Sequence, residues 1–366
     1  MSLDFRFAIV SDLHSALPQT VWHHANRFHL TEVSIPAFES ILEHLSQLNL
    51  DFLLLPGDLT QHGEPENHTW LAQRLAQLSF PVYVIPGNHD VPTLDADGYS
   101  IGLADFPHYY RKFGYQDPQQ LYYTCQVLPG VRLVALNSNT FNPQGKQVGA
   151  LNATQLEWLE EVLAAAKNEL VLVMVHHNVV EHMPGQTRHP LGRRYMLQNA
   201  PQLLQILRQA NVQLVFTGHL HVQNIACWGG VYDITTGSLV SYPHPYRVLH
   251  YSTCQGQPRL QVESLRVESI TGWPQLQHTS REWMGDRSIA FMMQMLTHPP
   301  LSLTPTEAEV LAPSLRYFWA AIADGDPVFH FPSFPAPARH YFESFSTPHP
   351  SGSIPGLADN NTTLLL

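Results

Sequence analysis

Cysteine is nearly absent from this sequence. Only three occur in 366 residues, and their positions give neither a metal-ligand spacing nor an even set of pairs: Cys125, Cys227 and Cys254. This argues against a disulfide-stapled scaffold, which needs paired cysteines, and against a site built on clustered thiolates. We therefore expect free thiols and a reducing compartment, the cytoplasm.

Positive charge and long apolar runs are also in short supply. Lysine and arginine number 19 against 30 aspartates and glutamates, a formal net charge of −11. This balance argues against a general nucleic-acid binder, because such proteins usually carry a basic patch. No apolar run is long enough to span a bilayer. The first strand-like segment, 5–10, begins almost at the N-terminus, so no signal peptide is visible. We expect a soluble cytoplasmic protein with neither nucleic-acid nor membrane partners.

Apolar residues make up 44% of the chain, charged residues only 13%, and histidine is abundant at 22 residues. This composition is typical of a globular protein, and the length suffices for two domains. Strand-like segments alternate with helical patterns, which predicts a parallel or mixed sheet covered by helices. The expected strands are 5–10, 52–55, 81–85, 121–127, 131–137, 170–175 and 212–216. The expected helices begin at Ser34, near Asn67, at a Thr154–Glu157 capping box and near Pro201.

The remainder of the chain divides near Gly272, where the composition changes. Before it, we expect a second, largely antiparallel sheet, made of 222–228, 231–236, 246–253 and 258–268. After it, helical patterns cover 279–296 and 304–323. The second of these opens with a capping box at Thr304 and closes before Gly325. Residues 326–366 are rich in Pro, Ser and His and are expected to lie on the surface.

The tetrapeptide Gly87-Asn88-His89-Asp90 follows the strand-like segment 81–85. The glycine allows a sharp backbone turn, and α/β sheets usually bind ligands at this end of their strands. Alone, the motif is equally compatible with a loop whose polar residues cap backbone groups.

Four further strand-like segments end in side chains that metal ions favour. These side chains are Asp12 and His14, Asp58, His176, and His219 with His221. Strands of one sheet bring their ends to one rim, so these residues can converge, and coincidence explains five such ends poorly. Two carboxylates, the Asn88 amide and four imidazoles suit two divalent ions. Mn, Fe, Zn and Co are all compatible with this set of ligands.

The order Asp-x-His, Gly-Asp, Gly-Asn-His-Asp, His and Gly-His-x-His resembles the calcineurin-like metallophosphoesterase superfamily over about residues 5–268. The contexts Thr236-Gly237-Ser238 and Pro243-His244-Pro245-Tyr246 are most similar to the bacterial class III cyclic nucleotide phosphodiesterases. The resemblance implies an α/β fold, a two-sheet αββα sandwich, with residues 1–271 as the catalytic domain. Residues 272–366 fall outside the shared pattern as a helical C-terminal appendage and surface tail.

The implied activity is hydrolysis of a phosphodiester by a hydroxide that bridges two metal ions. Cyclic nucleotides, cAMP or cGMP, are the first choice of substrate. Other nucleotides, phosphodiesters or phosphoproteins are the alternative substrates, and a non-catalytic metal-stabilised scaffold is the alternative function.

The resemblance also implies a role for each residue. Asp12, His14, Asp58 and His221 would hold one ion, and Asp58, Asn88, His176 and His219 the other. Asp58 would bridge ions about 3.5–4 Å apart. His89 would face the phosphate and stabilise it or protonate the leaving oxygen. Many members place an aspartate three residues after the bridging one; this chain has Gln61, which stabilises an imidazolium less.

Contacts with the substrate stay open at this stage. Loop 15–33 follows two of the expected ligands, and its Trp22, His23 and His24 could stack on a nucleobase or pack locally. His177 could contact a metal ligand or the substrate, or lie on the surface. The C-terminal helices must pack against their own catalytic domain or a second copy, which makes a homodimer through them one of two expectations.

Overall fold

The computed structural model describes residues 3–23, 27–254, 256–347 and 357–366. The strands of its two large sheets are β1 (Asp4–Ile9), β2 (Phe52–Leu55), β3 (Val82–Val84), β4 (Tyr123–Leu128), β5 (Val131–Ala135), β8 (Leu170–Met174), β9 (Leu214–Thr217), β10 (Asn224–Trp228), β11 (Val231–Thr235), β12 (Pro245–Cys254), β13 (Gln257–Arg266) and β14 (Thr362–Leu365). The first sheet has the order β14-β13-β12-β1-β2-β3, and the second has the order β10-β11-β9-β8-β5-β4. A separate hairpin pairs β6 (Asn139–Phe141) with β7 (Gln147–Gly149).

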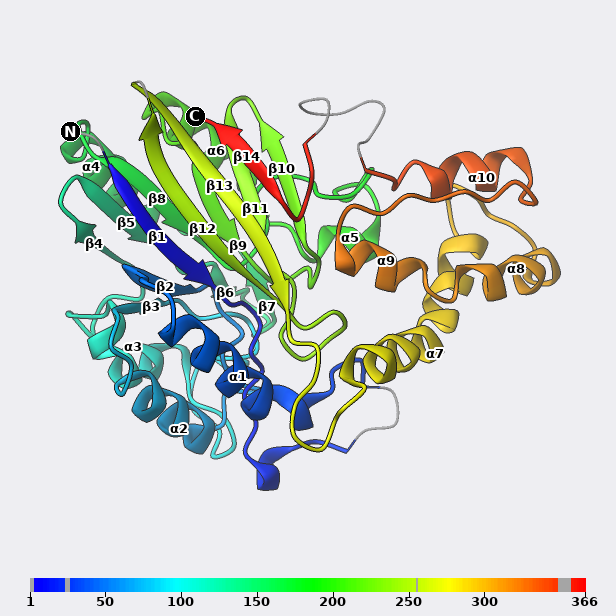
Figure 1. Ribbon diagram of the computed structural model, residues 1–366, viewed down its shortest axis with the longest axis horizontal. Coiled ribbons are helices and arrows are strands. Elements are labelled where there is room, and N and C mark those ends of the chain that lie inside the picture. Colours follow the sequence, from blue (N-terminus) through cyan, green and yellow to red (C-terminus); the bar gives the residue numbers. More distant parts are fainter. Residues whose placement is uncertain (1–2, 24–26, 255, 348–356) are drawn as a thin grey trace.

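The two sheets pack face to face through an apolar layer, as the two-sheet expectation requires (Figure 1). Phe7 of β1 meets Phe216 of β9 edge to face, with ring centroids 5.5 Å apart. All four residues of β2 are fully buried. Strands β1, β2 and β3 run parallel, and so do β5, β8, β9 and β11. Parallel strands covered on both faces read as continuous apolar runs, which is why the sequence revealed them.

Helices cover the outer faces of the sandwich. They are α1 (Ser34–Ser46), α2 (Pro65–Leu75) and the short α3 (Phe106–Tyr109) by the first sheet, and α4 (Ala153–Ala165) and α6 (Ala200–Gln209) by the second (Figure 1). The predicted capping box at Thr154 is wrong. Asn152 caps α4 instead, because its side chain accepts a hydrogen bond from the Gln155 amide at 2.8 Å.

The strands after residue 222 do not form a sheet of their own, which corrects the sequence expectation. Strands β10 and β11 extend the second sheet, where β11 lies parallel to β9. Strands β12 and β13 join the first sheet, where β12 lies antiparallel to β1. Alternating apolar residues identify a strand, but the choice of neighbour depends on which buried face it completes.

The C-terminal helices gather beside the sandwich, on the right of Figure 1. They are α7 (Leu276–Thr297), α8 (Pro305–Leu311), α9 (Phe318–Asp324) and α10 (Ala336–Glu343). The expected helix 304–323 is interrupted at Ala312–Leu315, where Pro313 has no N–H to donate. The cap at Thr304 and the left-handed Gly325 after α9 are confirmed. The helices share a core with Leu220 and Val222 of their own chain. The homodimer stays a prediction.

The end of the chain does more than lie on the surface. Strand β14 pairs antiparallel with β13, so the last residues return to the first sheet. The fully buried Arg247 donates to the Asp359 carbonyl at 2.7 Å, and Asn224 donates to the Asp359 carboxylate at 2.8 Å. These contacts fix the approach to β14.

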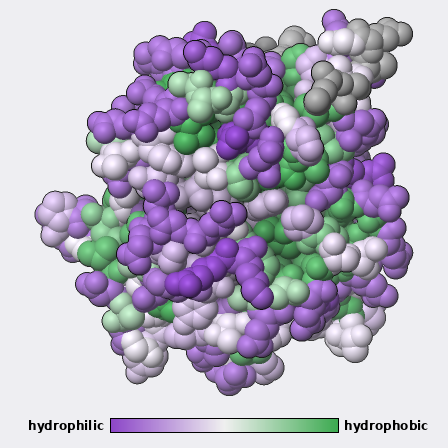
Figure 2. Space-filling view, turned by 90° about the vertical axis from the view of Figure 1, so that its left-hand side faces the viewer, coloured by the Kyte–Doolittle hydropathy of each residue, from purple (hydrophilic) through white to green (hydrophobic). Residues whose placement is uncertain are grey.

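The face opposite the C-terminal helices is largely polar, and its apolar side chains appear in separate patches (Figure 2). Within the described residues, we find no helix with both the length and the apolar content for a membrane crossing.

Candidate metal centre

The loops that leave the strands hold their polar residues in an unusual backbone conformation. Of the nine non-glycine residues with positive φ values among those described, five follow β1, β2 or β9: Asp12 (50°), His14 (42°), Asp58 (51°), His219 (67°) and His221 (60°). Such conformations cost about 1–3 kcal/mol each and persist where the surrounding structure imposes them, often at functional sites. All five are among the metal ligands expected from the sequence.

One group of possible ligands combines Asp12, His14, Asp58 and His221. Their ligand atoms all lie within 4.8 Å of one another. Nε2 of His221 is 3.0 Å from Oδ1 of Asp12, and Nε2 of His14 is 3.8 Å from Oδ2 of Asp58. This is the first set that the sequence predicted.

A second group combines Asp58, His176 and His219, also within 4.8 Å of one another. Nε2 of His176 is 3.4 Å from Oδ1 of Asp58 and 3.2 Å from the Asn88 side-chain oxygen. Asn88 therefore lies where the second predicted set needs it. Asp58 belongs to both groups, with Oδ2 toward His14 and Oδ1 toward His176.

Unsatisfied buried atoms show that this donor set fits divalent ions. Both ring nitrogens of His14 and Oδ2 of Asp58 are buried without a hydrogen-bond partner, an arrangement that is costly unless another group satisfies them. Burial, and then the His29 imidazole, hold the pKa of His14 well below its ordinary value. Its neutral ring is the form that binds metals.

The electrostatics keep Asp58 ionised. Burial favours its protonated form, but His176 and His89 outweigh burial and hold the pKa of Asp58 well below its ordinary value. For His176, burial opposes the charged ring, yet Asp58 raises the pKa to about 9. An ion that binds His176 would displace this proton, because a metal ligand must be deprotonated.

Neighbouring backbone groups orient the ligands. Nδ1 of His176 lies 2.8 Å from the Pro56 carbonyl, which leaves Nε2 to face Asp58. The amide of His219 donates to Oδ1 of Asp12 at 3.1 Å. A Cβ at Gly87 would collide with the Asp58 carboxylate, so only glycine permits this approach of the two loops.

Asp90 joins the loop after β2 to the loop after β3. Its fully buried carboxylate accepts hydrogen bonds from the amides of Leu59 (3.0 Å), Thr60 (2.8 Å) and Gly87 (2.8 Å). Burial, and then the charge of Asp58, raise its pKa to about 7. The last residue of the Gly-Asn-His-Asp motif is thus a structural clamp between the loops that carry Asp58 and His89.

Asp90→Ala is expected to lower the free energy of unfolding by at least about 2 kcal/mol, because buried amides lose their acceptor. Urea denaturation measures the change. Asp95→Ala, at an exposed position of the same region, is the control, and equal stability of the two variants would refute the clamp.

His89 lies over the first ligand group. Its backbone amide donates to Oδ1 of Asp58 at 2.8 Å, and its ring meets that of His14 edge-on at 4.6 Å. Nδ1 of His89 lies 2.7 Å from the main-chain carbonyl of Gln61. The sequence directed attention to the Gln61 side chain, whereas its backbone carbonyl is the partner.

The residues expected near the substrate separate in space. His177 is buried, with Nδ1 2.8 Å from Ser138 Oγ and its ring 4.4 Å from that of His219. Burial, and then the neighbouring His176, lower its pKa to about 3. Because β8 ends at Met174, strand alternation does not turn His177 away, and it lines the pocket described below.

Trp22 is 58% exposed and packs against His62 at 4.0 Å, and His62 in turn stacks on His89 at 5.3 Å. Neither Trp22 nor His23 is among the pocket-lining residues. His24 lies outside the described residues. Stacking of Trp22 on a substrate therefore stays a prediction.

A pocket of about 760 Å³ opens over the two ligand groups. Its floor includes Asp58, Asn88 and His219. Cationic side chains line it from the β6–β7 turn and from the short helix α5 (Pro190–Arg193) with its flanking residues. They are Lys146, Arg188, Arg193 and Arg194. The C-terminal helices supply an apolar wall: Met284, Phe291 and Trp319. Sequence reasoning named none of these lining residues, because their positions depend on contacts between distant segments.

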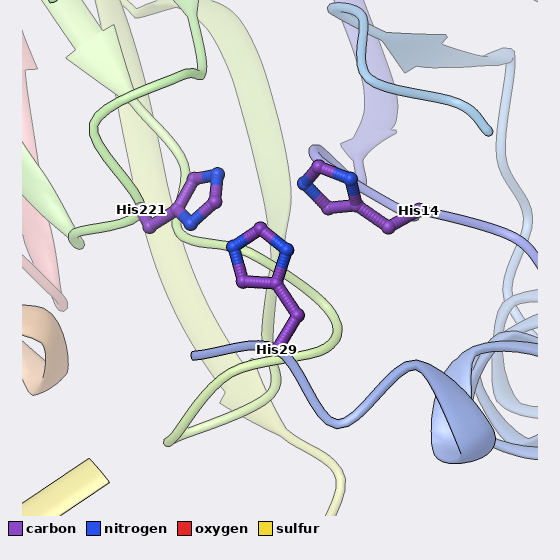
Figure 3. A group of neighbouring side chains, drawn as sticks. All are labelled: His14, His29 and His221. Atoms are coloured by element: carbon purple, nitrogen blue, oxygen red, sulfur yellow. The ribbon is translucent and has the colours of Figure 1, made fainter. Parts of the chain in front are cut away.

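His29 is a further site residue that the sequence reasoning missed. Its imidazole converges with those of His14 and His221, and the ligand atoms of these three residues also lie within 4.8 Å of one another (Figure 3). The only available signal was its place in loop 15–33, which directly follows His14. Nothing in the residue pattern distinguishes His29 from the other histidines of this loop.

Comparisons with known proteins agree with this geometry. The calcineurin-like phosphoesterase family model matches residues 5–223. A probable glycerophosphodiester phosphodiesterase of Arcobacter nitrofigilis is 28% identical over 192 residues, covering 51% of this chain and 63% of that protein. A 3',5'-cyclic-nucleotide phosphodiesterase of Nostoc sp. is 27% identical over 188 residues, covering 50% and 62%. These matches span less than two thirds of each relative.

Among solved structures, a dimetal phosphatase from Danio rerio has the same fold, with a TM-score of 0.52 at 16% identity. The match covers 71% of this chain and 95% of that one. The family model spans more than half of the chain and includes every strand end that carries a candidate ligand. The chain belongs to the calcineurin-like phosphoesterase family.

Proposed function

We propose that this protein is a metal-dependent hydrolase of small phosphodiesters, with 3',5'-cyclic nucleotides as the first choice of substrate. The observation that carries the proposal is the position of Asp58, whose two oxygens face two separate groups of ligands. A carboxylate shared in this way suits a pair of divalent ions. Bound there, the ions would supply charge for the phosphoryl oxygens and an activated water.

The chain's own residues would hold and orient the reacting groups. Asp12, His14, Asp58 and His221 would form one ion site, and Asp58, Asn88, His176 and His219 the other. Residues outside these sets contribute orientation, since the Pro56 carbonyl fixes the His176 ring and Asp90 fixes the loops. The mixed oxygen and nitrogen ligands suit Mn, Fe, Zn or Co.

His89 is placed to act on the substrate. Its main-chain contact with Asp58 and its Nδ1 contact with the Gln61 carbonyl set the ring position, and the residue lines the pocket. A proton at Nδ1 would be donated to that carbonyl, which leaves Nε2 as the atom that can reach substrate. A protonated Nε2 could stabilise a phosphoryl oxygen or give its proton to the leaving oxygen.

The pocket supports a small anionic substrate. Lys146, Arg188, Arg193 and Arg194 gather there in a chain whose net charge is −11. A cleft of one charge sign raises the local concentration of the opposite ion. The apolar wall of Phe291, Trp319 and Met284 suits a base or another organic group, and the volume is in the range of small-molecule sites.

A second candidate follows from the number of these cations. A cyclic nucleotide carries one negative charge, which the two metal ions alone could neutralise. Among the described residues, none of the four pocket cations forms an ion pair with an acidic side chain. This favours, as the alternative, a nucleotide or diester that bears a further phosphate.

A turnover panel with Mn²⁺ tests both candidates. Cyclic AMP, cyclic GMP, bis(p-nitrophenyl) phosphate, a glycerophosphodiester, a nucleoside diphosphate and p-nitrophenyl phosphate are compared by kcat/KM, with chelated protein as the control. We expect cyclic nucleotides to give the highest kcat/KM. Faster turnover of the diphosphate would favour the alternative. Faster turnover of the aryl monoester than of every diester would overturn the phosphodiesterase proposal.

A further inference from the structure

We propose that His29 is an additional ligand of the ion held by Asp12, His14, Asp58 and His221, and that Trp283 of the C-terminal helices positions it there. The inference deepens the proposed function and rests on its metal centre.

The first observation is the packing of three imidazoles. The ring centroid of His29 is 4.3 Å from that of His14 and 4.8 Å from that of His221 (Figure 3). Their ligand nitrogens lie within 4.8 Å of one another. Nitrogens on opposite sides of one ion would be about 4.2 Å apart, given metal–nitrogen bonds of about 2.0–2.1 Å. The three rings therefore have the spacing of ligands around a common ion.

The second observation is that these rings are not held together by hydrogen bonds. Both ring nitrogens of His14 are buried and lack a partner. A shared cation would satisfy the facing nitrogens.

The third observation is the anchoring of the His29 loop on both sides. The amide of Leu30 donates to the Val240 carbonyl at 2.8 Å. On the other side, the indole N–H of Trp283 in α7 donates to the Phe28 carbonyl at 3.1 Å. The guanidinium of Arg27 also lies over the Trp283 ring, 5.5 Å from its centroid. Helix α7 thus fixes the residue that precedes His29.

The consequence concerns the ligand count. Asp12, His14, Asp58 and His221 give the first ion four protein ligands, and His29 would be the fifth. An octahedral ion would then keep a single position for water or substrate. The appendage would act on the chemistry through this contact, because its Trp283 determines where the fifth ligand lies. Trp283 is a positioning residue in this scheme, and His29 the ligand.

Metal titration tests the inference without relying on turnover. Protein freed of metal by chelation is titrated with Mn²⁺ by calorimetry and with Co²⁺ by visible absorption. His29→Ala should raise the Kd of one ion by at least about 10-fold, the lower bound for losing a group that orients a ligand. The Co²⁺ spectrum should change, and added imidazole should restore it.

The variants and controls separate ligand loss from unfolding. His29→Gln keeps a polar side chain and serves if the alanine variant unfolds. Trp283→Phe removes the donated N–H but keeps a smaller aromatic ring, and should weaken binding of the same ion by less than His29→Ala does. His108→Ala and His278→Ala, at exposed histidines in α3 and α7, should titrate like the native protein.

Unchanged Kd values and an unchanged Co²⁺ spectrum in the His29 variants would overturn the inference. If turnover alone fell, His29 would be a substrate contact instead. If the native protein bound fewer than two ions, or if Asp58→Asn left binding unchanged, the metal centre of the proposed function would fail instead.

Discussion

Asp58→Asn is expected to release at least one of two bound ions and to lower turnover by at least about 10³-fold, since removing even one preorganised electrostatic contact costs about 10²–10³. The amide has almost the same shape as the carboxylate but lacks its charge, and its nitrogen cannot ligate a cation. Because both oxygens of Asp58 face ligand groups, one substitution should weaken both sites. Elemental analysis gives the metal content, and the rate is measured on cyclic AMP with Mn²⁺.

Asp95→Asn is the matched control, because Asp95 is exposed and outside both ligand groups. It should keep two ions and the native rate. Two fully occupied ion sites in Asp58→Asn would show that this carboxylate does not bridge.

His89→Asn should lower turnover of cyclic nucleotides by about 10²–10⁴, the range for a lost general acid or base. The ions should stay bound, because the contact between residue 89 and Asp58 is made by the main-chain amide and survives the substitution. Rates on cyclic AMP and on bis(p-nitrophenyl) phosphate are compared alongside the metal content.

The aryl substrate distinguishes the two roles of His89. A p-nitrophenolate leaves without needing a proton, so its rate should fall less if His89 is the acid. Equal losses would indicate phosphate stabilisation instead. His108→Asn serves as the control at an exposed histidine. Loss of an ion from His89→Asn would mean that the residue is a ligand and that its role was assigned wrongly.

The sequence predicted those parts of the fold that depend on local patterns. Apolar runs located β2 and β8 closely, and the Thr304 cap and Gly325 marked helix ends that the structure confirms. Sheet membership was not predictable in this way. The alternating apolar residues of β12 could be buried either beside β1 or in a separate sheet. Only the assembled core places β12 beside β1.

The site was also predictable only where its residues lie at strand ends. Residues at strand ends were identified on the expectation that one sheet brings such ends together. The structure instead draws them from both sheets. Asp12, His14, Asp58 and Asn88 follow strands of the first sheet, and His176, His219 and His221 follow strands of the second. His29 and most of the pocket cations come from loops, whose paths depend on tertiary contacts such as the one between Trp283 and Phe28. No local pattern records contacts of this kind.

The return of the chain to the first sheet changes what kind of element the appendage is. Strands β13 and β14 are antiparallel neighbours, with Val262 opposite Thr362, so everything between them occupies the place of a hairpin turn. The appendage is in this sense an insertion, tethered at two points, and not an extension. Cutting the chain at residue 272 would also remove β14 and take Asp359 from the buried Arg247. An internal deletion closed by a short turn would preserve the sheet edge.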